Sequence, residues 1–556
     1  MPYSNATKQA FADALRKLLE QKPFAKISVS HICEECGMNR KSFYYHFKDK
    51  YDLVNWIFDT EITKIFSEEE WKNAGFTWDI LEKICEYFYK HRTFYSKVLQ
   101  IEGQNSFTEH FRDILVPVNR KFLAMVEEEE KGEHEEFYIH FFSDAFLAAL
   151  VRWLEDRECV SPQEFSALLR SSVEMIAKYV LHLKNSAKQC YLHDNDKDYL
   201  IAGYPWFKVI ARDLFIALPG TTLAIKHRQD FERIMDTASA ALIKLMDTGE
   251  TDKTIEDLDL PDIPLWAAWC IQQYYKFTNP QDTLKKYGAL LEKIINHIID
   301  GKQNNLYIGK DGLLSTDGSK TPATWMDAIK TNGLPVIPRT GYVVEFNALW
   351  YNALMFATTI FEEQGKSPER IYKWKETAES LKTAFVETFL NDYGYLYDYV
   401  DGNYMDLSVR PSMLIAVGCD FSPLDKSQRK KVLDFVTREL LTPNGVRTLS
   451  PKSFGYNPFF VGNKVQRQLA SFNGPTRPWM TGFYTDAYLK VFGHSGVAFL
   501  RRMLIGYEDD MTRECIGSIS ELYDGNPPYT GHGAISFAPS IGGVLRALAT
   551  LNSFDV

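Results

Sequence analysis

Hydrophobic positions near the start of the sequence recur at helical spacing. From about Ser4 onward they lie three and four residues apart, which places them on one face of an expected helix. The residues of this face are Phe11, Ala14, Leu15, Leu18 and Leu19. A polar run at 127–136 is expected to be a solvated loop, and it precedes a strongly apolar helix at 137–155 and another helix from Ser161. Two such helices in succession favour either a dimer face or the core of a small helical domain.

Between the first helix and the polar run, the pattern changes to that of short helices and a turn. Ser28 can cap one short helix, and Gly37 is placed to end it, because glycine readily adopts the positive φ of a helix C-terminus. Asn39 is then a good N-cap for a further helix at 40–47. A short helix, a glycine turn and a second short helix form the helix-turn-helix pattern, whose later helix enters the major groove of DNA.

Basic side chains are concentrated on and after this later helix. Residues 38–50 contain Arg40, Lys41, Lys48 and Lys50 against a single acidic residue, Asp49. Tyrosine and histidine side chains beside them can hydrogen-bond to phosphate groups or base edges. The chain as a whole has a formal net charge of −10. Any contact with DNA must therefore come from a local basic face such as this one.

Glycine and proline divide the chain into two parts. Residues 1–187 contain 4 of the 32 glycines and 4 of the 23 prolines. We therefore expect an almost uninterrupted helical first part, followed by helices that are separated by long, structured loops. Loops of that kind are where binding and catalytic groups usually lie. A polar stretch at 193–198 is interpreted as a connector, and the boundary is expected near 185–198.

Several classes of protein are excluded by the composition. A membrane span would need about 18 consecutive apolar residues, which do not occur, and the first residues lack the apolar core of a signal peptide. Of the eight cysteines only Cys33 and Cys36 are closely spaced, so we expect no zinc site and reduced thiols in the cytoplasm. The second part has no metalloprotease motif and no phosphate-binding glycine loop, so neither a metal nor a cofactor is expected.

The loops of the second part are rich in carboxylates and aromatic side chains. Glycoside hydrolysis needs two carboxyl groups beside one bond, one protonated to donate to the leaving oxygen and one ionised to activate water. Aromatic walls raise the pKa of the first carboxyl group by excluding water. The segments with this composition are AGYPWFKVIARD at 202–213, TWMD at 324–327, PRTGYVVEFNALWYN at 338–352, GVRTLS at 445–450 with Trp479, and SISELYDG at 518–525.

The first part resembles the tetracycline-repressor-like family of regulators. The resemblance is carried by residues 27–53, above all by the Phe-Tyr-x-His-Phe-x-x-Lys core at 43–50, and it extends over roughly 1–185. It implies an all-helical homodimer that senses a small ligand in its helical domain and contacts operator DNA through residues 28–50. The residues implied to approach DNA are Asn39, Arg40, Lys41, Tyr44, Tyr45, His46 and Lys50.

The carboxylate-rich segments, taken together and in this order, resemble the catalytic domain of the amylo-α-1,6-glucosidase (glycogen debranching enzyme) family over about 190–556. The resemblance implies an (α/α)6 barrel with its site at one mouth, and removal of α-1,6-linked glucose with inversion. It implies that Asp327 is the general acid and Glu521 the general base, with carboxyl groups roughly 6.5–9.5 Å apart. Arg212 and Asp213 would hold the far hydroxyl groups of the glucose. The other substrate-binding residues expected are Trp206, Trp325, Arg339, Glu345, Asn347, Trp479, Tyr523 and Asp524.

Each of these assignments has a structural alternative. Asp327 could cap a helix, and Glu521 could pair with a surface arginine. Arg212 and Asp213 could form a structural ion pair, and the tryptophans could belong to the core. Pocket segments also depart from the family pattern around 211, 477 and 537, where alanine, arginine and phenylalanine stand. These departures affect the pocket walls, and so the fit of a substrate, rather than the two carboxylates.

The sequence therefore predicts an all-α chain of three domains. These are a helix-turn-helix domain at 1–60, a helical regulatory and dimerisation domain at 61–187, and an (α/α)6 barrel at 188–556. The expected function is an α-glucan debranching hydrolase fused to a DNA-binding regulator, with a glycogen-derived oligosaccharide, operator DNA and a second copy as partners. One alternative is a transcriptional regulator whose barrel senses a sugar. The other is a fusion whose two parts were not selected to work together.

Overall fold

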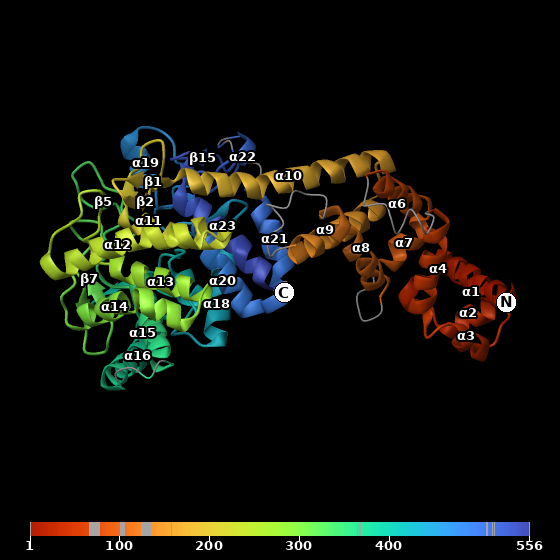
Figure 1. The fold of residues 1–556 in the computed structure, drawn as a ribbon, viewed down its shortest axis with the longest axis horizontal. Coiled ribbons are helices and arrows are strands. Elements are labelled where there is room, and N and C mark those ends of the chain that lie inside the picture. Colours follow the sequence, from red (N-terminus) through yellow and green to blue (C-terminus); the bar gives the residue numbers. More distant parts are fainter. Residues whose placement is uncertain are drawn as a thin grey trace. The chain divides into compact units, whose positions relative to one another are not determined.

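The computed structural model describes residues 2–65, 78–99, 106–123, 135–156, 158–363, 365, 368–507, 510–513, 515 and 517–554. The chain forms two compact units, Met1–Lys178 with Asp555–Val556, and Tyr179–Phe554. Helices dominate both units, and the strands are short (Figure 1). None of the described helices is long and apolar enough to cross a lipid bilayer.

The N-terminal unit begins with α1 (Pro2–Gln21), the short 3-10 helix η1 (Phe24–Lys26), α2 (Val29–Glu35) and α3 (Arg40–His46). The Oγ atom of Ser28 accepts a hydrogen bond from the backbone of His31, whose side chain accepts one from the backbone of Ser28. The Oδ1 atom of Asn39 accepts a hydrogen bond from the backbone of Ser42 at 2.8 Å. Gly37, with a φ of 67°, forms the turn between α2 and α3. The predicted caps and the glycine turn are confirmed.

Aromatic packing orients α3 on α1. Phe43 and Phe47, one turn apart on α3 and its C-cap, are both buried, and their rings lie 5.2 and 6.4 Å from the ring of Phe11. Tyr44 and Tyr45 lie on the opposite side of α3, where they are 51% and 83% exposed. The apolar edge of α3 is thus turned to the core and its aromatic-polar edge to solvent.

The rest of the N-terminal unit is a helical bundle around Phe58. Its helices are α4 (Lys50–Ile65), α6 (Trp78–Lys90), α7 (Arg92–Val98), α8 (Phe107–Leu123), α9 (Glu135–Glu155) and the start of α10 (Pro162–Gln189). The Phe58 ring contacts the rings of Tyr87, Phe88, Tyr95, Phe107 and Phe111. Most of the polar run predicted as a loop at 127–136 lies outside the described residues, which resume with α9.

The second unit is a closed ring of helices. Six inner helices contact one another in the order α11, α13, α15, α17, α20 and α23, and α23 packs back against α11. Their bounds are α11 (Ala211–Thr221), α13 (Ile263–Lys276), α15 (Val344–Glu362), α17 (Met413–Gly418), α20 (Met480–Phe492) and α23 (Ala538–Phe554). The intervening helices bury one face each and are α12 (Arg228–Thr248), α14 (Pro280–Ile299), α16 (Pro368–Phe389), α18 (Lys426–Leu440) and α21 (Val497–Ile505). The predicted (α/α)6 barrel is confirmed.

Glycine allows the ring to close. A Cβ atom added to Gly220 of α11 would overlap the carbonyl oxygen of Gly542 on α23. A Cβ atom on Gly542 would lie 2.7 Å from the carbonyl oxygen of Ala217. The two helix backbones are therefore in direct contact, at a separation that no larger residue at either position permits.

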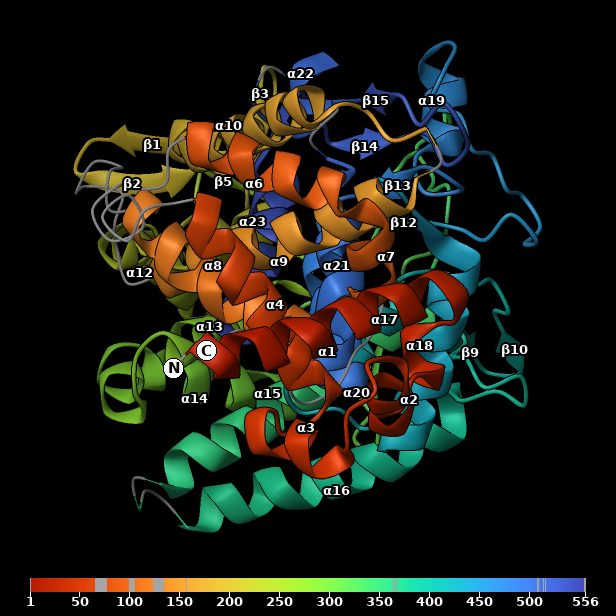
Figure 2. The same ribbon diagram turned by 90° about the vertical axis from the view of Figure 1, so that its right-hand side faces the viewer.

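Short strands connect the helices. One five-stranded antiparallel sheet has the order β10-β9-β8-β7-β6. Another has the order β11-β12-β13-β14-β15, and Figure 2 labels β12 to β15 of this sheet. The strands of the first are β6 (Tyr307–Ile308), β7 (Leu314–Thr316), β8 (Gly341–Val343), β9 (Tyr399–Asp401) and β10 (Tyr404–Met405). Those of the second are β11 (Leu441–Thr442), β12 (Gly445–Arg447), β13 (Thr476–Arg477), β14 (Leu522–Tyr523) and β15 (Gly531–His532). Thr476 pairs with Tyr523, which brings the residues around 477 and 521 together.

The polar stretch interpreted as a connector is a β-hairpin instead. β1 (Tyr191–Asp194) pairs with β2 (Lys197–Leu200) across a two-residue turn. The turn residues Asn195 and Asp196 have φ values of 47° and 63°, which asparagine and aspartate tolerate better than most residues. The connector prediction is therefore wrong, because polar turn residues within a hairpin have the composition of a linker. The two units divide earlier, between Lys178 and Tyr179 within α10.

Candidate functional site

Some of the predicted site residues, together with several neighbours of theirs, lie at the N-terminal ends of the inner helices. They lie in the first turn of the helix or in the segment leading to it, and they are Arg212 and Asp213 for α11, Asp262 for α13, Glu345 for α15, Ser412 for α17, Arg477 and Trp479 for α20, and Ala534 for α23. Helix N-termini carry partial positive charge, which stabilises nearby carboxylates. One end of the ring thus combines carboxylates with a favourable local field.

Asp327 follows β7 on a long connection, and its side chain is 59% exposed. Its Oδ2 atom lies 3.7 Å from an Nη1 atom of Arg212, which is itself only 4% exposed. The Nε and Nη2 atoms of Arg212 donate to the carboxylate of Asp262 at 2.7 and 3.0 Å, and Trp266 donates to the same carboxylate. Arg212 is therefore held from behind by Asp262, not by Asp213, and presents its remaining nitrogen to Asp327.

Glu521 precedes β14 and has two donors. The Nη1 atom of Arg477 donates to its Oε1 atom at 2.8 Å, and the backbone N–H of Ala534 donates to Oε2 at 3.1 Å. The Glu521 side chain is 15% exposed, and Arg477 is 5% exposed. The partner is therefore a buried arginine, not the surface arginine of the structural alternative. Sequence reasoning noted residue 477 only as a departure from the family pattern.

Asp213, Asp327 and Glu521 interact electrostatically. Loss of hydration and the negative charge of Asp327 raise the pKa of Asp213 to about 7, against the lowering effect of Arg212. Asp327 keeps an exposed side-chain surface, but the protein atoms around it still weaken its hydration and raise its pKa. Arg212 and Arg477 lower this pKa, and the charge of Glu521 raises the pKa of both Asp213 and Asp327 further. Asp213 and Asp327 are thus the carboxyl groups disposed to hold a proton.

The tryptophans of the site divide into a buried pair and an exposed one. Trp325 and Trp479 are 6% and 5% exposed and pack edge to face, with ring centroids 5.3 Å apart. The indole nitrogen of Trp325 donates to Ser412 at 3.2 Å. Trp206, after β3 (Gly203–Tyr204), is 60% exposed. The buried pair supports the site from within the core, whereas Trp206 is available to stack on a sugar.

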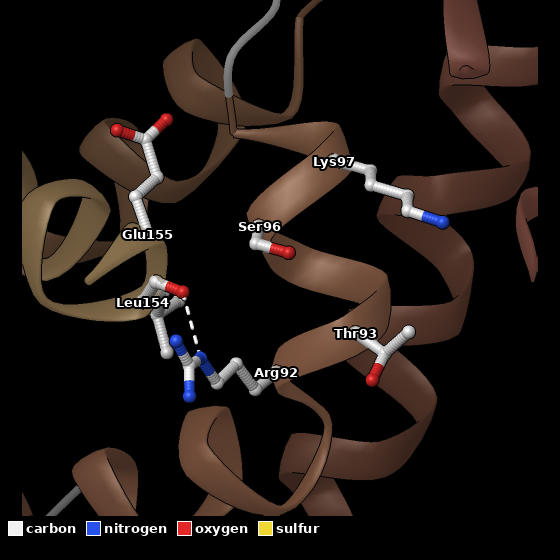
Figure 3. Close-up of a pocket in the computed structure, with 6 residues that line it drawn as sticks. All are labelled: Arg92, Thr93, Ser96, Lys97, Leu154 and Glu155. Atoms are coloured by element: carbon white, nitrogen blue, oxygen red, sulfur yellow. Dashed lines mark hydrogen bonds between the residues drawn. The ribbon is translucent and has the colours of Figure 1, made fainter. Parts of the chain in front are cut away.

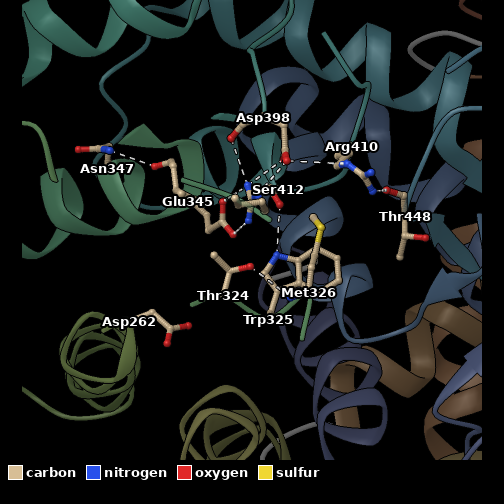
Figure 4. A network of polar contacts seen from close by, with 12 residues as sticks. Asp262, Thr324, Trp325, Met326, Glu345, Asn347, Asp398, Arg410, Ser412 and Thr448 are labelled. Atoms are coloured by element: carbon tan, nitrogen blue, oxygen red, sulfur yellow. Dashed lines mark hydrogen bonds and ion pairs between the residues drawn. The ribbon is translucent and has the colours of Figure 1, made fainter. Parts of the chain in front are cut away.

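Glu345 and Asp398 belong to a buried polar network (Figure 4). Arg339 is part of the same network. Arg339 donates to the carboxylates of Glu345 and Asp398, with Nη2–oxygen distances of 2.7 and 2.8 Å, and Asp398 also faces Arg410. Loss of hydration raises the pKa of Asp398 to about 6. Arg339 and Glu345 are each 1% exposed, so neither has surface free for direct contact with a substrate in this structure, and their expected part in substrate binding stays a prediction. They brace the connections beneath the site.

Asn347, Tyr523 and Asp524 are buried as well, at 0%, 1% and 3% exposure. Asn347 accepts a hydrogen bond from the backbone of Leu314 and returns one to it, which ties β7 to α15. Tyr523 donates to Asp510, and Asp524 accepts from the backbone of residue 460. The polar atoms of these three residues hold loops in place, and their expected substrate contacts likewise stay a prediction.

The DNA-binding candidates on α3 form an exposed surface. Lys41 is exposed, and the Arg40 guanidinium lies over the Tyr44 ring at 5.9 Å from its centroid. Tyr45 projects furthest into solvent and contacts the half-buried ring of His46 edge to face. This surface has the donors and aromatic edges that contact phosphates and bases.

Lys50 is placed differently from the expectation. Its Nζ atom donates to the backbone carbonyls of Phe24 and Ile27, both at 2.8 Å, and lies 4.4 Å from the centroid of the Phe24 ring. Loss of hydration lowers its pKa. Lys50 therefore ties the start of α4 to η1, and its expected role in DNA contact is corrected to a structural one.

A cavity of about 560 Å³ opens in the N-terminal unit between α7 and the end of α9 (Figure 3). It is lined by Arg92, Thr93, Ser96, Lys97, Leu154 and Glu155. Arg92 donates to the carbonyl of Leu154 near the end of α9, and Lys97 donates to the carbonyl of Leu19 near the end of α1. These two cations therefore cap helix C-termini. Across the ranges that the structure describes, no group of three or more His, Cys, Asp or Glu residues could hold a metal ion.

Comparisons with known proteins found matches for both parts of the chain. The model for bacterial regulatory proteins of the tetR family matches residues 12–57, and that for a transcriptional regulator C-terminal region matches 77–175. The HTH-type dhaKLM operon transcriptional activator DhaS of Lactococcus lactis subsp. lactis (strain IL1403) is 24% identical over 161 residues, which are 27% of this chain and 81% of that protein.

Solved structures are similar to the barrel. The GH63 mannosylglycerate hydrolase of Thermus thermophilus, in complex with Tris and D-glycerate, has a TM-score of 0.46 at 12% identity and covers 68% of this chain and 100% of its own. An uncharacterized conserved protein of the same organism has a TM-score of 0.46 at 13% identity, over 66% of this chain and 99% of its own. The amylo-alpha-1,6-glucosidase family model matches residues 171–546, which is more than half of the sequence. The chain therefore belongs to the amylo-alpha-1,6-glucosidase family, and its N-terminal part is similar to tetR-family regulators over residues 12–57 and 77–175.

Proposed function

We propose that the barrel is an inverting α-1,6-glucosidase that removes single glucose units from α-glucans, with Asp327 as general acid and Glu521 as general base. The observation that carries this proposal is the contrast between the two carboxyl groups. Asp327 is in a setting that raises its pKa, whereas Glu521 accepts hydrogen bonds at both oxygens. An acid and a base at one site need such a contrast.

The proposed reaction is a single displacement. Asp327 donates its proton to the glycosidic oxygen as the bond to the anomeric carbon breaks. Glu521 takes a proton from the water that attacks that carbon from the opposite face, so the configuration inverts. Arg212 orients Asp327, and the protonated form of Asp213 would donate a hydrogen bond to a hydroxyl group of the glucose. Trp206 would stack on the sugar beyond it.

Glucose release from a phosphorylase limit dextrin, pretreated to expose single-glucose stubs, tests this proposal. Asp327→Asn should lower kcat by about 100- to 10,000-fold, the usual contribution of a general acid. Asp317→Asn is a matched control, because Asp317 lies on the same connection but accepts a hydrogen bond from the backbone of Ser319. Equal release by the wild type and Asp327→Asn would contradict the assignment.

We also propose that α3 contacts operator DNA, that the N-terminal unit forms a homodimer, and that both occur in the cytoplasm. The exposed basic and aromatic surface of α3 supports the first part. The alternative function, a regulator whose barrel only senses sugar, predicts that Asp327→Asn keeps the sugar response of a reporter gene. The hydrolase function predicts that the same variant loses glucose release whatever happens to the reporter.

A further inference from the structure

We infer that Arg477 is a positioning residue of the barrel site, which holds the Glu521 carboxylate in place and limits how tightly Asp327 and Asp213 hold a proton. The inference rests on the proposed function, since it concerns the same two catalytic carboxyl groups. It assigns to Arg477 a role in the reaction that the sequence motifs do not contain.

The guanidinium of Arg477 is anchored on several sides. Its Nη2 atom donates to the Oγ atom of Ser471 at 2.7 Å and to the Ser471 carbonyl at 3.3 Å. The guanidinium lies over the ring of Phe472, 4.5 Å from its centroid, and the side chain is almost fully buried. These contacts orient the Nη1 atom toward Glu521, to which it donates a hydrogen bond at 2.8 Å. An arginine held in this way imposes its geometry on the carboxylate.

The backbone fixes the other side of Glu521. The Ala534 N–H donates to Oε2, and the preceding residue, Gly533, has a φ of 77°. A Cβ atom at Gly533 would overlap Oε2, so the carboxylate is in contact with this turn. The Glu521 carboxylate is therefore held between Arg477 and this turn. Each of its oxygens keeps a lone pair that can accept a hydrogen bond from water in a defined direction.

The charges around the site follow from the same contacts. Arg212 is committed to Asp262 by two hydrogen bonds, and Arg477 is committed to Glu521. Asp213 and Asp327 are therefore neutralised less completely by these two arginines. The charge of Arg477 still lowers the pKa of both. Arg477 therefore sets how tightly the acid side of the site holds its proton.

Variants at position 477 test the inference by steady-state kinetics between pH 4 and 9 on an α-1,6-glucosidic substrate. Arg477→Gln should lower kcat by about 100-fold, because a misplaced base costs about that much. It should also move the basic limb of the kcat/KM profile to higher pH, because the pKa of Asp327 rises when a nearby positive charge is lost. Arg477→Lys keeps the charge and should leave the limb in place, while recovering only part of kcat, because one ammonium group cannot bind both Glu521 and Ser471 as arginine does.

Arg447→Gln is the matched control, since Arg447 lies on the neighbouring strand β12. It donates to the backbone carbonyls of Gly525 and Leu441 at 2.7 and 3.2 Å. Its loss should lower the melting temperature without moving the pH profile. An equal fall of kcat at every pH in Arg477→Gln, with Arg477→Lys no better, would overturn the inference.

A second measurement does not require turnover. In the full chain labelled with carboxyl-¹³C aspartate, the signals of Asp213 and Asp327 can be assigned by their loss in the asparagine variants. Their titration midpoints should rise in Arg477→Gln and stay in place in Arg447→Gln. Unchanged midpoints in both would overturn the inference about Arg477. A wild-type barrel that releases no glucose would instead overturn the proposed function, and the titration would still decide the role of Arg477.

Discussion

Single carboxyl groups at the barrel site differ because their neighbours differ. Asp213 is removed from water next to another carboxylate, and its pKa is about 7. Glu521, in the same site, receives a guanidinium and a backbone N–H. A carboxyl group whose pKa is raised by folding destabilises the folded protein where it ionises. The raised pKa of Asp213 should therefore make the free energy of unfolding depend on pH.

Asp213→Asn should stabilise the barrel at high pH. Because the pKa of Asp213 is raised from 3.8 to about 7 by folding, the folded state binds the proton more tightly. The stabilisation of the folded state by the proton on Asp213 is complete below about pH 4 and is lost as the pH rises through about 7. Asparagine cannot ionise, so the variant should gain about 1 kcal/mol or more at pH 8 and little near pH 4.5. Urea unfolding at the two pH values measures the difference, and an equal gain at both would contradict it.

Gly533→Ala should impair the proposed base, Glu521, without unfolding the barrel. The new methyl group would meet Oε2 of Glu521 and displace the carboxylate, so kcat should fall by about 100-fold. Gly402→Ala is the control, because Gly402 also has a positive φ but has no atoms within 4 Å of the place that a Cβ atom would take. Both variants should lose a similar 1–2 kcal/mol, roughly, from backbone strain. Similar kcat values for the two would count against the clamp on Glu521.

At the scale of elements, the helix-turn-helix shows which inferences a linear pattern supports. The caps Ser28 and Asn39 and the turn at Gly37 act within a few residues, so sequence reasoning located them correctly. Lys50 follows the same basic motif, yet its ammonium group reaches back to carbonyls more than 20 residues earlier. Charge alone does not tell whether a lysine faces solvent or the end of another helix.

Lys50→Ala should therefore affect stability, whereas Lys41→Ala should affect DNA binding. Lys50→Ala removes two hydrogen bonds from a charged donor and should destabilise the N-terminal unit by about 1–3 kcal/mol. Lys41→Ala should leave the melting temperature unchanged while weakening operator binding and reducing the slope of log affinity against log salt by about one. Gel shifts over a salt series and thermal melts measure both. A Lys50→Ala variant with normal stability and weakened DNA binding would show that Lys50 contacts DNA.

At the scale of the whole molecule, two separate hydrophobic cores support two structural units. One core surrounds Phe58 in the bundle, and the other fills the helical ring around residues such as Trp350. Multidomain chains of this kind generally do not unfold in one step. Each core should then set the stability of its own unit.

Calorimetry of the full chain should show two unfolding transitions that respond to different substitutions. Phe58→Ala should destabilise one transition and Trp350→Ala the other, each by about 3–5 kcal/mol, because both side chains are fully buried. The assignment follows from which transition moves. A single transition that both variants shift together would show that the units unfold cooperatively.

Sequence reasoning predicted the fold more completely than the site. Helical periodicity and the glycine and proline distribution indicate the two parts, because these properties are local in sequence, and family motifs single out Asp327 and Glu521 as the candidates for acid and base. The pairing of Arg212 with Asp262 and of Arg477 with Glu521 joins residues from distant segments. The burial of Arg339 and Glu345 likewise depends on helices that close over them. Such contacts become visible only when the ring has been assembled.

The contact between α11 and α23 has a consequence for how the protein folds during its synthesis on the ribosome. The ring can close only when Ala538–Phe554 has been synthesised, long after Ala211–Thr221 has emerged. Until then the apolar faces that α23 covers remain without their partner, and contacts of such long sequence separation form slowly. The N-terminal bundle has no such delay, since domains fold as units in the order of synthesis. The nascent barrel should therefore depend on chaperones during an interval in which the bundle is already folded.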